Sequence, residues 1–266
     1  KEDLLLKKEI LNGLTARSFN LLNNLEIKNQ TDSTNDDAKE SLKKPHIKLS
    51  AHMAEQQNSG RGRNNRKWVS PFGQNIYLSL AWRSNLTFSD IEGLSLAIGV
   101  QVAESLEELT KEKIKIKWPN DLLINEKKLG GILIETSSGG KDTLEIIIGI
   151  GVNVFMQNKD ANEIDQDWTS LENYKKRNLD RNLIAAKILN NLLALTKDFK
   201  TTGFAGYIQA FKNRNALENK KCEVILDGKV SSTGLVTGIN NKGELLIEIN
   251  NEIINLRYGE VSIREL

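Results

Sequence analysis

Apolar and polar residues alternate along the chain with two periods, one typical of helices and one of strands. Leucine and isoleucine recur at helical spacing within residues 1–24, which predicts one or two short helices. A strand is predicted near 25–28, followed by a helix that starts at Ser33 or Thr34, because both residue types cap helices, and ends near Lys43. Residues 47–56 form the next predicted strand.

The middle of the chain predicts a sheet with one long helix beside it. Residues 57–74 follow no period and form a long predicted loop, and 75–82 alternate as a strand does. A helical apolar face follows at Ile91, Leu94, Ile98, Val102, Leu106 and Leu109. Four short segments then carry many isoleucines and leucines, as buried strands do, at 114–117, 122–124, 129–135 and 144–150.

The predicted secondary structure changes near residue 215, from helices to short strands separated by turns. Before that point, Asp180 can cap a helix whose buried face runs to Phe199, and a further helix is predicted over 204–213. After it, turn-forming pairs such as Asp227-Gly228 separate about five short strands, which predicts a small barrel. We therefore expect an α+β protein with a larger, sheet-containing domain at 1–215 and a small β-barrel at 216–266.

Composition narrows the function classes. The 266 residues are 39% hydrophobic and 27% charged, with a formal net charge of +2, so a broad basic surface for DNA is not indicated. No apolar run approaches the roughly 18 residues that a membrane helix needs, and we expect no membrane association. The single cysteine, Cys222, excludes an intramolecular disulfide and suits a reducing cytoplasm.

Several chemistries are disfavoured by what the sequence lacks. With two histidines and one cysteine, the usual Cys/His zinc sites cannot be built, and triad catalysis is disfavoured. We expect His46 on the surface, His52 within a strand and Cys222 in the packing of the barrel. No P-loop is present. Gly149-Ile150-Gly151-Val152-Asn153 is similar to a dinucleotide fingerprint but lacks its third glycine; the alternative is a strand end that another group approaches closely.

The segment from Gly60 to Trp68 combines four cations, two glycines and a tryptophan. Glycine lets backbone N–H groups approach a ligand, arginine pairs with phosphate or carboxylate oxygens, and tryptophan stacks on bases or cations. This combination favours an anion with an aromatic part, such as ATP. Taken alone, the segment fits a solvated basic loop equally well.

Two further motifs favour the ligand-binding interpretation. Lys117-Trp118-Pro119-Asn120-Asp121 lies between two predicted strands, where Pro119 forces an extended conformation on the residue before it. An ordinary turn also uses Pro-Asn-Asp, but the flanking Lys117 and Trp118 are less expected there. Lys128 then precedes two glycines and a buried strand, a position from which its amine can reach a carboxylate.

These groups suit the joining of a carboxylic acid to ATP. The carboxylate attacks the α-phosphate, pyrophosphate leaves, and the acyl-adenylate then reacts with an amine without an enzyme nucleophile. The protein's work is to position the reactants and to neutralise charge, which arginine, lysine and a metal ion can do. The scarcity of histidine and cysteine agrees with such a reaction.

Taken together, the motifs resemble those of bacterial biotin–protein ligases, in the same order and over the whole chain. The matching residues are Ser33-Thr34-Asn35, Gln57, Gly60-Arg61-Gly62-Arg63, Arg66, Trp68-Val69-Ser70-Pro71, Lys117–Asp121, Lys128–Leu133 and Gly149–Asn153. The resemblance implies a mixed-sheet catalytic domain of the class II synthetase-like type at 1–215 and an SH3-like barrel at 216–266. It also implies ATP, biotin and Mg²⁺ as reactants and cofactor, with biotinyl-5′-AMP as the intermediate.

The resemblance also implies a role for each motif residue. Biotin is expected to contact Ser33, Thr34, Asn35, Gln57, Gly60, Arg61, Gly62, Arg63 and Lys128. ATP or the adenylate is expected to contact Arg63, Arg66, Trp68, Lys117, Asn120 and Asn153. Lys128, Arg63 and Asp121 are the expected catalytic residues, and Asp121 is also the expected metal ligand.

The implied partner is the biotin carboxyl carrier protein of acetyl-CoA carboxylase, and relatives often form homodimers through sheet edges. A lipoate–protein ligase is the alternative enzyme, although the Gly60–Arg63 and Lys117–Asp121 motifs together argue against it. A biotin-operon repressor is the non-enzymatic alternative. About 30 residues before the first motif cannot hold a winged-helix domain, so we expect no DNA binding by the chain as given; it does not begin with methionine, which leaves open a preceding domain.

Overall fold

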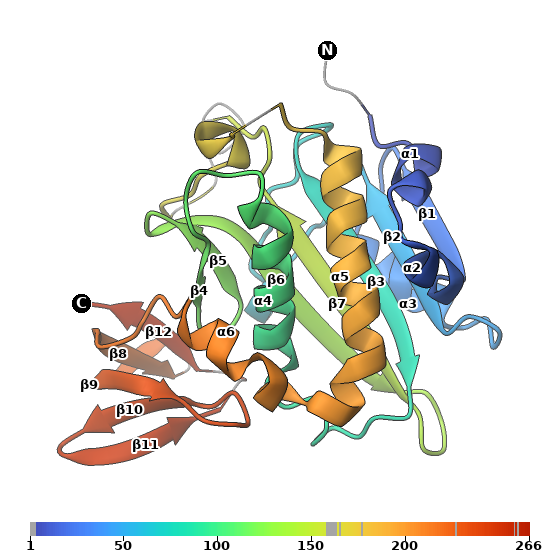
Figure 1. The fold of residues 1–266 in the computed structure, drawn as a ribbon. Helices are drawn as coiled ribbons and strands as arrows, with labels where there is room; N and C mark the ends of the chain where they lie inside the picture. The colour runs from blue at the N-terminus through green and yellow to red at the C-terminus, as the bar shows by residue number, and fades with distance from the viewer. Residues whose placement is uncertain are drawn as a thin grey trace.

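A computed structural model describes residues 4–157, 164, 166–176, 178–226, 228–257, 259 and 261–266. Its larger part is built on a seven-stranded mixed sheet in the order β1-β2-β3-β7-β6-β5-β4 (Figure 1). β1 and β2 are parallel and the remaining neighbours are antiparallel. The strands are β1 (Asn24–Lys28), β2 (Leu49–Ala54), β3 (Ile76–Ser84), β4 (Lys115–Lys117), β5 (Asp121–Ile124), β6 (Lys127–Ser138) and β7 (Leu144–Val152).

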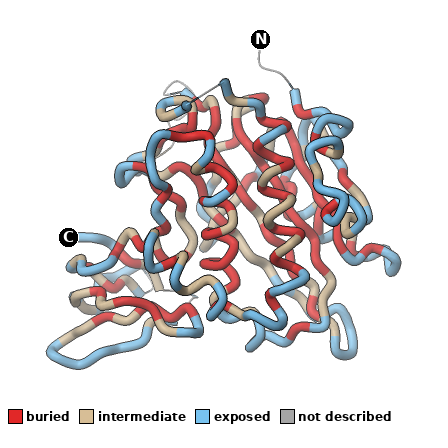
Figure 2. Tube along the Cα trace, in the orientation of Figure 1, coloured by how far each residue is buried: buried red, intermediate tan, exposed pale blue. Residues whose placement is uncertain are grey.

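Two long helices cover one face of this sheet, and a short helix covers part of the other. α4 (Leu94–Glu107) and α5 (Arg181–Thr202) lie side by side over the central strands (Figure 1). Figure 2 shows the buried positions concentrated in these helices and the strands beneath them. α3 (Thr34–Ser41) packs on the opposite face, against β2, β3 and β7. The helices and strands predicted over residues 25–199 are therefore confirmed, with ends that differ by a few residues.

The N-terminal segment packs against α5 through α1 (Lys7–Asn12) and α2 (Ala16–Leu21). Leu5 N–H donates to Glu55 Oε1, and Glu55 is held in turn by a buried ion pair: its Oε2 lies 2.7 Å from Arg181 Nη1 of α5, and both side chains are 1% exposed. Removing one partner of such a pair would leave a buried charge uncompensated, which costs several kcal/mol. This pair therefore fixes the chain's N-terminal segment on the domain.

Two helix predictions need correction. Ser33 occupies the N-cap of α3 as predicted, but its side chain makes no capping hydrogen bond. The helix predicted over 204–213 is divided into a 3₁₀ turn, η4 (Phe204–Tyr207), and α6 (Ile208–Lys212). Gly206 and the aromatic residues of this segment have low helix propensity, which favours the tighter turn. Asp180 caps α5 as predicted, because its side chain accepts from Asn182 N–H.

The C-terminal part is a five-stranded antiparallel sheet that fits an SH3-like barrel, in the order β11-β10-β9-β8-β12 (Figure 1). Its strands are β8 (Lys221–Leu226), β9 (Lys229–Ile239), β10 (Leu245–Ile249), β11 (Glu252–Leu256) and β12 (Ser262–Glu265). Cys222, on β8, is buried in this part of the molecule, as predicted. The boundary near Ala216 remains our proposal.

The barrel is attached to the catalytic domain at the Lys117–Asp121 turn. Trp118 is 2% exposed and its Nε1 donates to the carbonyl oxygen of Gly243, in the β9–β10 turn, at 3.0 Å. Ile116 N–H donates to Arg214 O, and Ala216 N–H donates to Ile116 O, so β4 also binds the segment that leads into the barrel. The barrel is thus held next to the motif residues. None of the helices in the described ranges is long and apolar enough to cross a membrane.

Candidate active site

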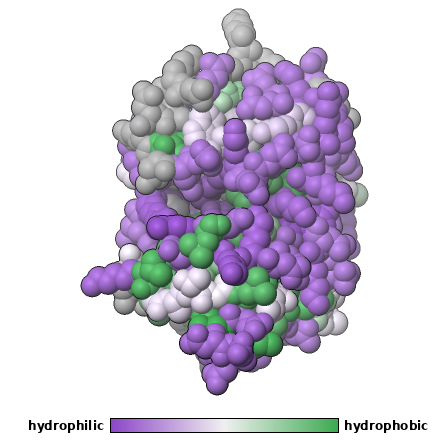
Figure 3. Space-filling view, turned by 90° about the vertical axis from the view of Figure 1, so that its left-hand side faces the viewer, coloured by the Kyte–Doolittle hydropathy of each residue, from purple (hydrophilic) through white to green (hydrophobic). Residues whose placement is uncertain are grey.

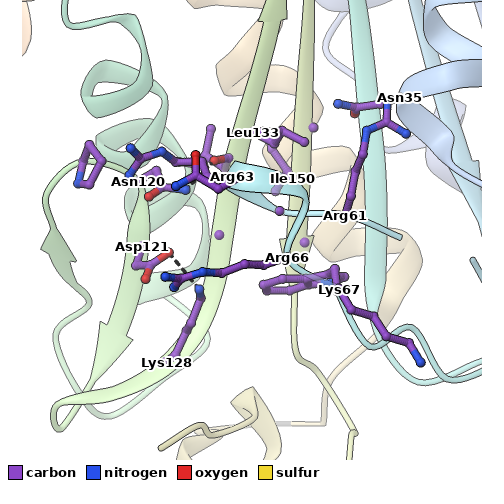
Figure 4. Close-up of a pocket in the computed structure, with 18 of the residues that line it drawn as sticks. Asn35, Arg61, Arg63, Arg66, Lys67, Asn120, Asp121, Lys128, Leu133 and Ile150 are labelled. Carbon is purple, nitrogen blue, oxygen red and sulfur yellow. Dashed lines mark hydrogen bonds and ion pairs between the residues drawn. The ribbon is translucent and has the colours of Figure 1, made fainter. Parts of the chain in front are cut away.

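A polar cavity lies on the sheet face that carries α3, between this face, the Gly60–Trp68 loop and the barrel. Most of the motif residues named from the sequence line it: Ser33, Thr34, Asn35, Gln57, Arg61, Gly62, Arg63, Arg66, Trp68, Lys117, Asn120, Asp121 and Lys128. Figure 4 shows that Arg61 extends toward Asn35 while Arg66 extends toward Asp121 and Lys128. Segments from four separate stretches of sequence therefore meet at one site.

One end of the cavity, which we call the α3 end, holds linked hydroxyl and amide groups. Thr34 N–H and Oγ1 both donate to Gln57 Oε1, at 2.9 and 3.0 Å, and Gln57 Nε2 donates to Ser70 Oγ at 3.1 Å. Ser79 Oγ lies within 2.8 Å of Thr34 Oγ1 and 2.6 Å of Asn35 Oδ1. These bonds fix the orientation of each polar group before a ligand arrives.

The charge of Arg61 is compensated within the α3 end. Its guanidinium pairs with both carboxylate oxygens of Asp36, at 2.9 and 2.7 Å, and with Glu135 at 3.1 and 3.2 Å. Asn35 Nδ2 donates to the same Glu135 at 2.6 Å. The hydrogen bond from Arg61 holds the pKa of Asp36 below its usual range, and Asp36 in turn raises the pKa of Arg61. The Arg61 pairs join the loop to α3 and β6.

Arg63, two residues further along the loop, reaches the barrel instead. Its Nη2 donates to the carbonyl oxygens of Gly259 and of Val261, the latter at 3.1 Å. Ser262 and Ile263 of the barrel also line the cavity. The barrel is therefore part of the cavity wall, and the loop lies between the two domains.

The other end of the cavity, which we call the lysine end, contains an ion pair. Lys128 Nζ lies 2.9 Å from Asp121 Oδ1 and 5.5 Å from the centre of the Trp68 ring. The two side chains are 16% and 23% exposed, so a ligand can reach them. Lys117 lies beside Asp121, its partner in the β4–β5 register. Trp68 Nε1 is buried and has no hydrogen-bond partner among the described residues.

Two glycines of β7 make room for cavity side chains. A Cβ at Gly149 would lie 2.4 Å from Asn35 Oδ1, and one at Gly151 would lie 2.5 Å from Trp68 Cε2. Both distances are too short for any side chain. The Gly149–Asn153 run is therefore a strand end that other groups approach closely, and these groups are Asn35 and Trp68.

The Lys117–Asp121 motif is a turn that β6 holds in place. Asn120 N–H donates to Lys117 O at 3.1 Å, and Asn120 Nδ2 donates to Ile132 O at 2.8 Å. The peptide bond before Pro119 is cis. The turn directs Lys117 and Asp121 into the cavity, while Trp118 binds the barrel.

Two residues predicted for the site do not line the cavity. Gly60 packs under the loop, where a Cβ would lie 2.7 Å from both Ser70 Oγ and Trp68 O. Asn153 is 4% exposed and its Nδ2 donates to Thr169 O at 3.1 Å. Their contacts with ligand stay predictions, and the geometry gives each a structural role.

Sequence reasoning missed several groups that bear on the site. Asp36 follows the Ser33–Asn35 motif and Glu135 lies two residues after the Lys128–Leu133 motif, but nothing in their spacing predicts that both bind Arg61. Gln166, Ser262 and Ile263 also line the cavity. They lie far along the chain from the motifs, and no local pattern identifies them.

The cavity has a strong excess of positive charge. Among the described residues that line it, six are cations and one, Asp121, is an anion. The chain as a whole has a formal net charge of only +2. Such local concentration is typical of sites for phosphates or carboxylates. No group of three or more His, Cys, Asp or Glu side chains among the described residues could hold a metal ion by itself.

Comparison with known proteins agrees with this chemistry. The biotin/lipoate A/B protein ligase family profile matches residues 27–153, and the biotin protein ligase C-terminal domain profile matches 219–264. A solved biotin protein ligase from Aquifex aeolicus, in complex with biotin and ATP, is 32% identical with a TM-score of 0.76. The match covers 92% of this chain and 100% of that one. The chain belongs to the biotin protein ligase family.

Two named relatives match about four fifths of the chain. The bifunctional ligase/repressor BirA of Escherichia coli is 38% identical over 214 residues, which are 80% of this chain and 66% of that protein. The biotin–[acetyl-CoA-carboxylase] ligase of Mycobacterium tuberculosis is 29% identical over 213 residues, 79% of this chain and 77% of that protein. The chain thus spans just under two thirds of the length of the BirA relatives.

Proposed function

We propose that this protein is a biotin–protein ligase, which activates biotin with ATP and transfers it to a lysine of a carrier protein. The observation that supports this most is the division of the cavity into an end of oriented, uncharged hydrogen-bonding groups and an end rich in cations. Biotin has a matching division between a neutral ureido ring and a carboxylate, and ATP supplies a polyanion with an aromatic base.

The α3 end is suited to the ring of biotin. The ureido group needs both donors and acceptors at short range, which Ser, Thr, Asn and Gln provide. Ser33 is only 3% exposed, and its hydroxyl makes no capping bond, so it can bind a ligand. We infer that Ser33, Thr34, Asn35 and Gln57 hold the ring, and that the backbone of Arg61 and Gly62 covers it.

The lysine end is suited to the reacting groups. A carboxylate oxygen of biotin attacks the α-phosphorus of ATP, the bond to the bridging oxygen breaks, and pyrophosphate leaves. We infer that Lys128 holds the carboxylate and the α-phosphate, since its ammonium reaches the cavity and Asp121 fixes its position. Arg63, Arg66, Lys117 and Asn120 offer donors to the phosphates. Positioned cations stabilise the negative charge of such a transition state.

Trp68 is suited to the nucleotide base. Its ring packs against Gly151 of β7 and lies beside the ammonium of Lys128. Stacking of a base on tryptophan contributes about 1–3 kcal/mol.

Transfer then needs no protein nucleophile: the ε-amine of the carrier lysine attacks the biotinyl carbonyl, AMP leaves, and the amine loses a proton.

Mg²⁺ fits this site only together with ATP. Asp121 is the sole carboxylate among the described lining residues, and it already pairs with Lys128. Mg²⁺ is commonly held by one or two carboxylates plus substrate phosphates. We propose that Asp121 supplies one oxygen ligand and the phosphates the others; the ion would neutralise phosphate charge.

The proposed protein substrate is the biotin carboxyl carrier protein of acetyl-CoA carboxylase, and the proposed compartment is the cytoplasm. A homodimer through sheet edges remains a prediction, and sedimentation of the purified protein would test it.

Lipoate ligation is the competing activity within the matched family profile. The hydrogen-bonding groups of the α3 end favour biotin, because the dithiolane ring of lipoate has no ureido group for them to bind.

A single experiment tests the proposal. Purified protein is incubated with biotin, ATP and Mg²⁺, and adenylate formation is followed by pyrophosphate release; a biotin carrier domain is then added and labelling is measured by mass. We expect both steps with biotin and neither with lipoate. Absence of adenylate, or adenylate from lipoate in place of biotin, would overturn the assignment.

A further inference from the structure

We propose that a groove beside the cavity, with one wall of lysines from the β4 region, binds an acidic surface of the carrier next to its acceptor lysine. This inference rests on the proposed function, because it assigns a docking site to the protein substrate of that reaction. Lys113 and Lys115 are its central residues. We call this surface the lysine groove; it lies between β4, β5 and the barrel.

The lysines share one side of the chain because polar and apolar residues alternate there. Ile114 and Ile116 are buried on the α4 side, whereas Lys113 and Lys115 are exposed. Lys115 pairs with Leu123 of β5, and Lys117 pairs with Asp121. Directly opposed residues point to the same face of a sheet. Lys115 and Lys117 are therefore on the face that holds the ion pair of the active site, and Lys111 and Lys113 line the same groove.

The groove is continuous with the cavity. Lys117, Asp121, Lys128 and Gln166 line both. Figure 3, which views the molecule from the side of β4 and β5, shows a hollow bordered by hydrophilic residues between the upper part of the molecule and the barrel. The acceptor amine must approach the biotinyl carbonyl near Lys128. A carrier seated in the groove would lie beside that point.

Some charged side chains of the groove form ion pairs and others do not. Lys220, on the barrel wall, pairs with Glu126 at 3.1 Å and with Glu265 at 2.8 Å, and Asp121 pairs with Lys128. The row of Lys111, Lys113, Lys115 and Lys117 has no ion pair among the described residues.

Three further acidic groups, Glu112, Asp167 and Glu218, border the groove. Glu218 accepts a hydrogen bond from Asn215 Nδ2 at 2.7 Å, which directs it toward the chain that leads into the barrel. The described lining of the groove thus carries six lysines and six carboxylates, and the lysines without an ion pair gather on the β4 wall. An acidic protein surface would complement that wall.

The row is too long to serve the nucleotide alone. Lys117 is four positions after Lys113, which in extended chain is a span of roughly 13 Å. Lys117 is near enough to the cavity for phosphate contact, but Lys113 and Lys115 lie progressively further along the groove. Unpaired charges at such a rim mainly accelerate and orient association with an oppositely charged partner.

The test is the double variant Lys113→Glu with Lys115→Glu, assayed in both half-reactions. We expect kcat/KM for the carrier to fall about tenfold or more, with weaker dependence on salt, while the rate of biotinyl-adenylate formation and the KM for ATP stay unchanged. The adenylate assay also shows that the variant is folded. The matched control is Lys8→Glu with Lys197→Glu, two exposed lysines on α1 and α5, which we expect to behave as wild type.

Three outcomes would overturn the proposal. An unchanged kcat/KM for the carrier would remove the groove from docking, and an equal loss in the control pair would reduce the effect to net charge. A raised KM for ATP would assign the lysines to polyphosphate. Failure of the wild-type protein to form adenylate would instead reject the proposed function itself.

Discussion

The two ends of the cavity differ in how their charges are arranged. At the α3 end, Arg61 is paired with two carboxylates, Asp36 and Glu135, and the other groups are hydroxyls and amides. At the lysine end, Lys128 and Lys117 stand with Arg66 around one carboxylate, Asp121. Figure 4 shows Asn35 and Arg61 on one side of the view, and Asp121 and Lys128 with the end of the Arg66 side chain on the other.

This difference in charge suggests different roles for the two ends: the α3 end binds by hydrogen bonds, and the lysine end neutralises charge. Because Asp36 and Glu135 neutralise the charge of Arg61, this residue contributes little electrostatic potential to the cavity. The α3 end can therefore hold a neutral ring by hydrogen bonds in fixed directions. An excess of cations lowers the energy of a polyanion and of the charge that develops on it. Loss of a group at the lysine end should therefore slow chemistry, whereas loss at the α3 end should weaken binding and loop order.

The largest effect is expected from Lys128→Ala. Removal of the amine that pairs with Asp121 should cost about 2–4 kcal/mol in the transition state for adenylation, more than it weakens biotin binding, while thermal stability changes little. Pyrophosphate release in single-turnover assays measures the first quantity, calorimetric titration with biotin the second, and thermal unfolding the third. A variant that forms adenylate at near the wild-type rate would show that the two ends do not divide the work in this way.

A smaller effect is expected from Arg63→Gly. The variant loses the bonds to Gly259 O and Val261 O and gains backbone freedom, so the loop should close less firmly against the barrel. A charged hydrogen bond contributes about 1.5–3 kcal/mol, and we expect faster escape of the adenylate, measured by a trapping assay. Arg63→Lys, which keeps the charge but not the planar fork, should recover part of the retention. Retention equal to wild type in the glycine variant would argue against this role.

The smallest effect is expected from Asp36→Asn at the α3 end. The Asp36 side chain is 56% exposed, and such ion pairs contribute about 0–1 kcal/mol. We expect slightly weaker biotin binding by titration and an unchanged adenylation rate at saturating biotin. Because Arg61 lowers the pKa of Asp36, this contribution is present above the ordinary value of 3.8 and is lost only as the pH falls through the lowered pKa. The wild-type affinity should thus stay constant across neutral pH as far as this pair is concerned.

The spacing of apolar residues was sufficient to predict most helices and strands, because an element that buries one face must carry apolar residues at its own structural period. The apolar face from Ile91 to Leu109 predicted α4, and the change of pattern near 215 predicted the barrel. Periodicity failed where the signal was weak: the helix predicted over 204–213 is a 3₁₀ turn followed by one and a half turns of α-helix. Short segments of this kind depend on packing more than on propensity.

The sequence by itself determined the residue types of the site and the order of its motifs, because the chemistry of Arg, Lys, Gly and Trp belongs to the side chains wherever they lie. Only the tertiary structure decided their partners. It paired Arg61 with Glu135, 74 residues away, brought Ser262 and Ile263 into the cavity, and turned Asn153 toward Thr169. The physical reason is that ion pairing and hydrogen bonding depend on distance in space, and no local pattern specifies which distant strands the sheet and the barrel bring together.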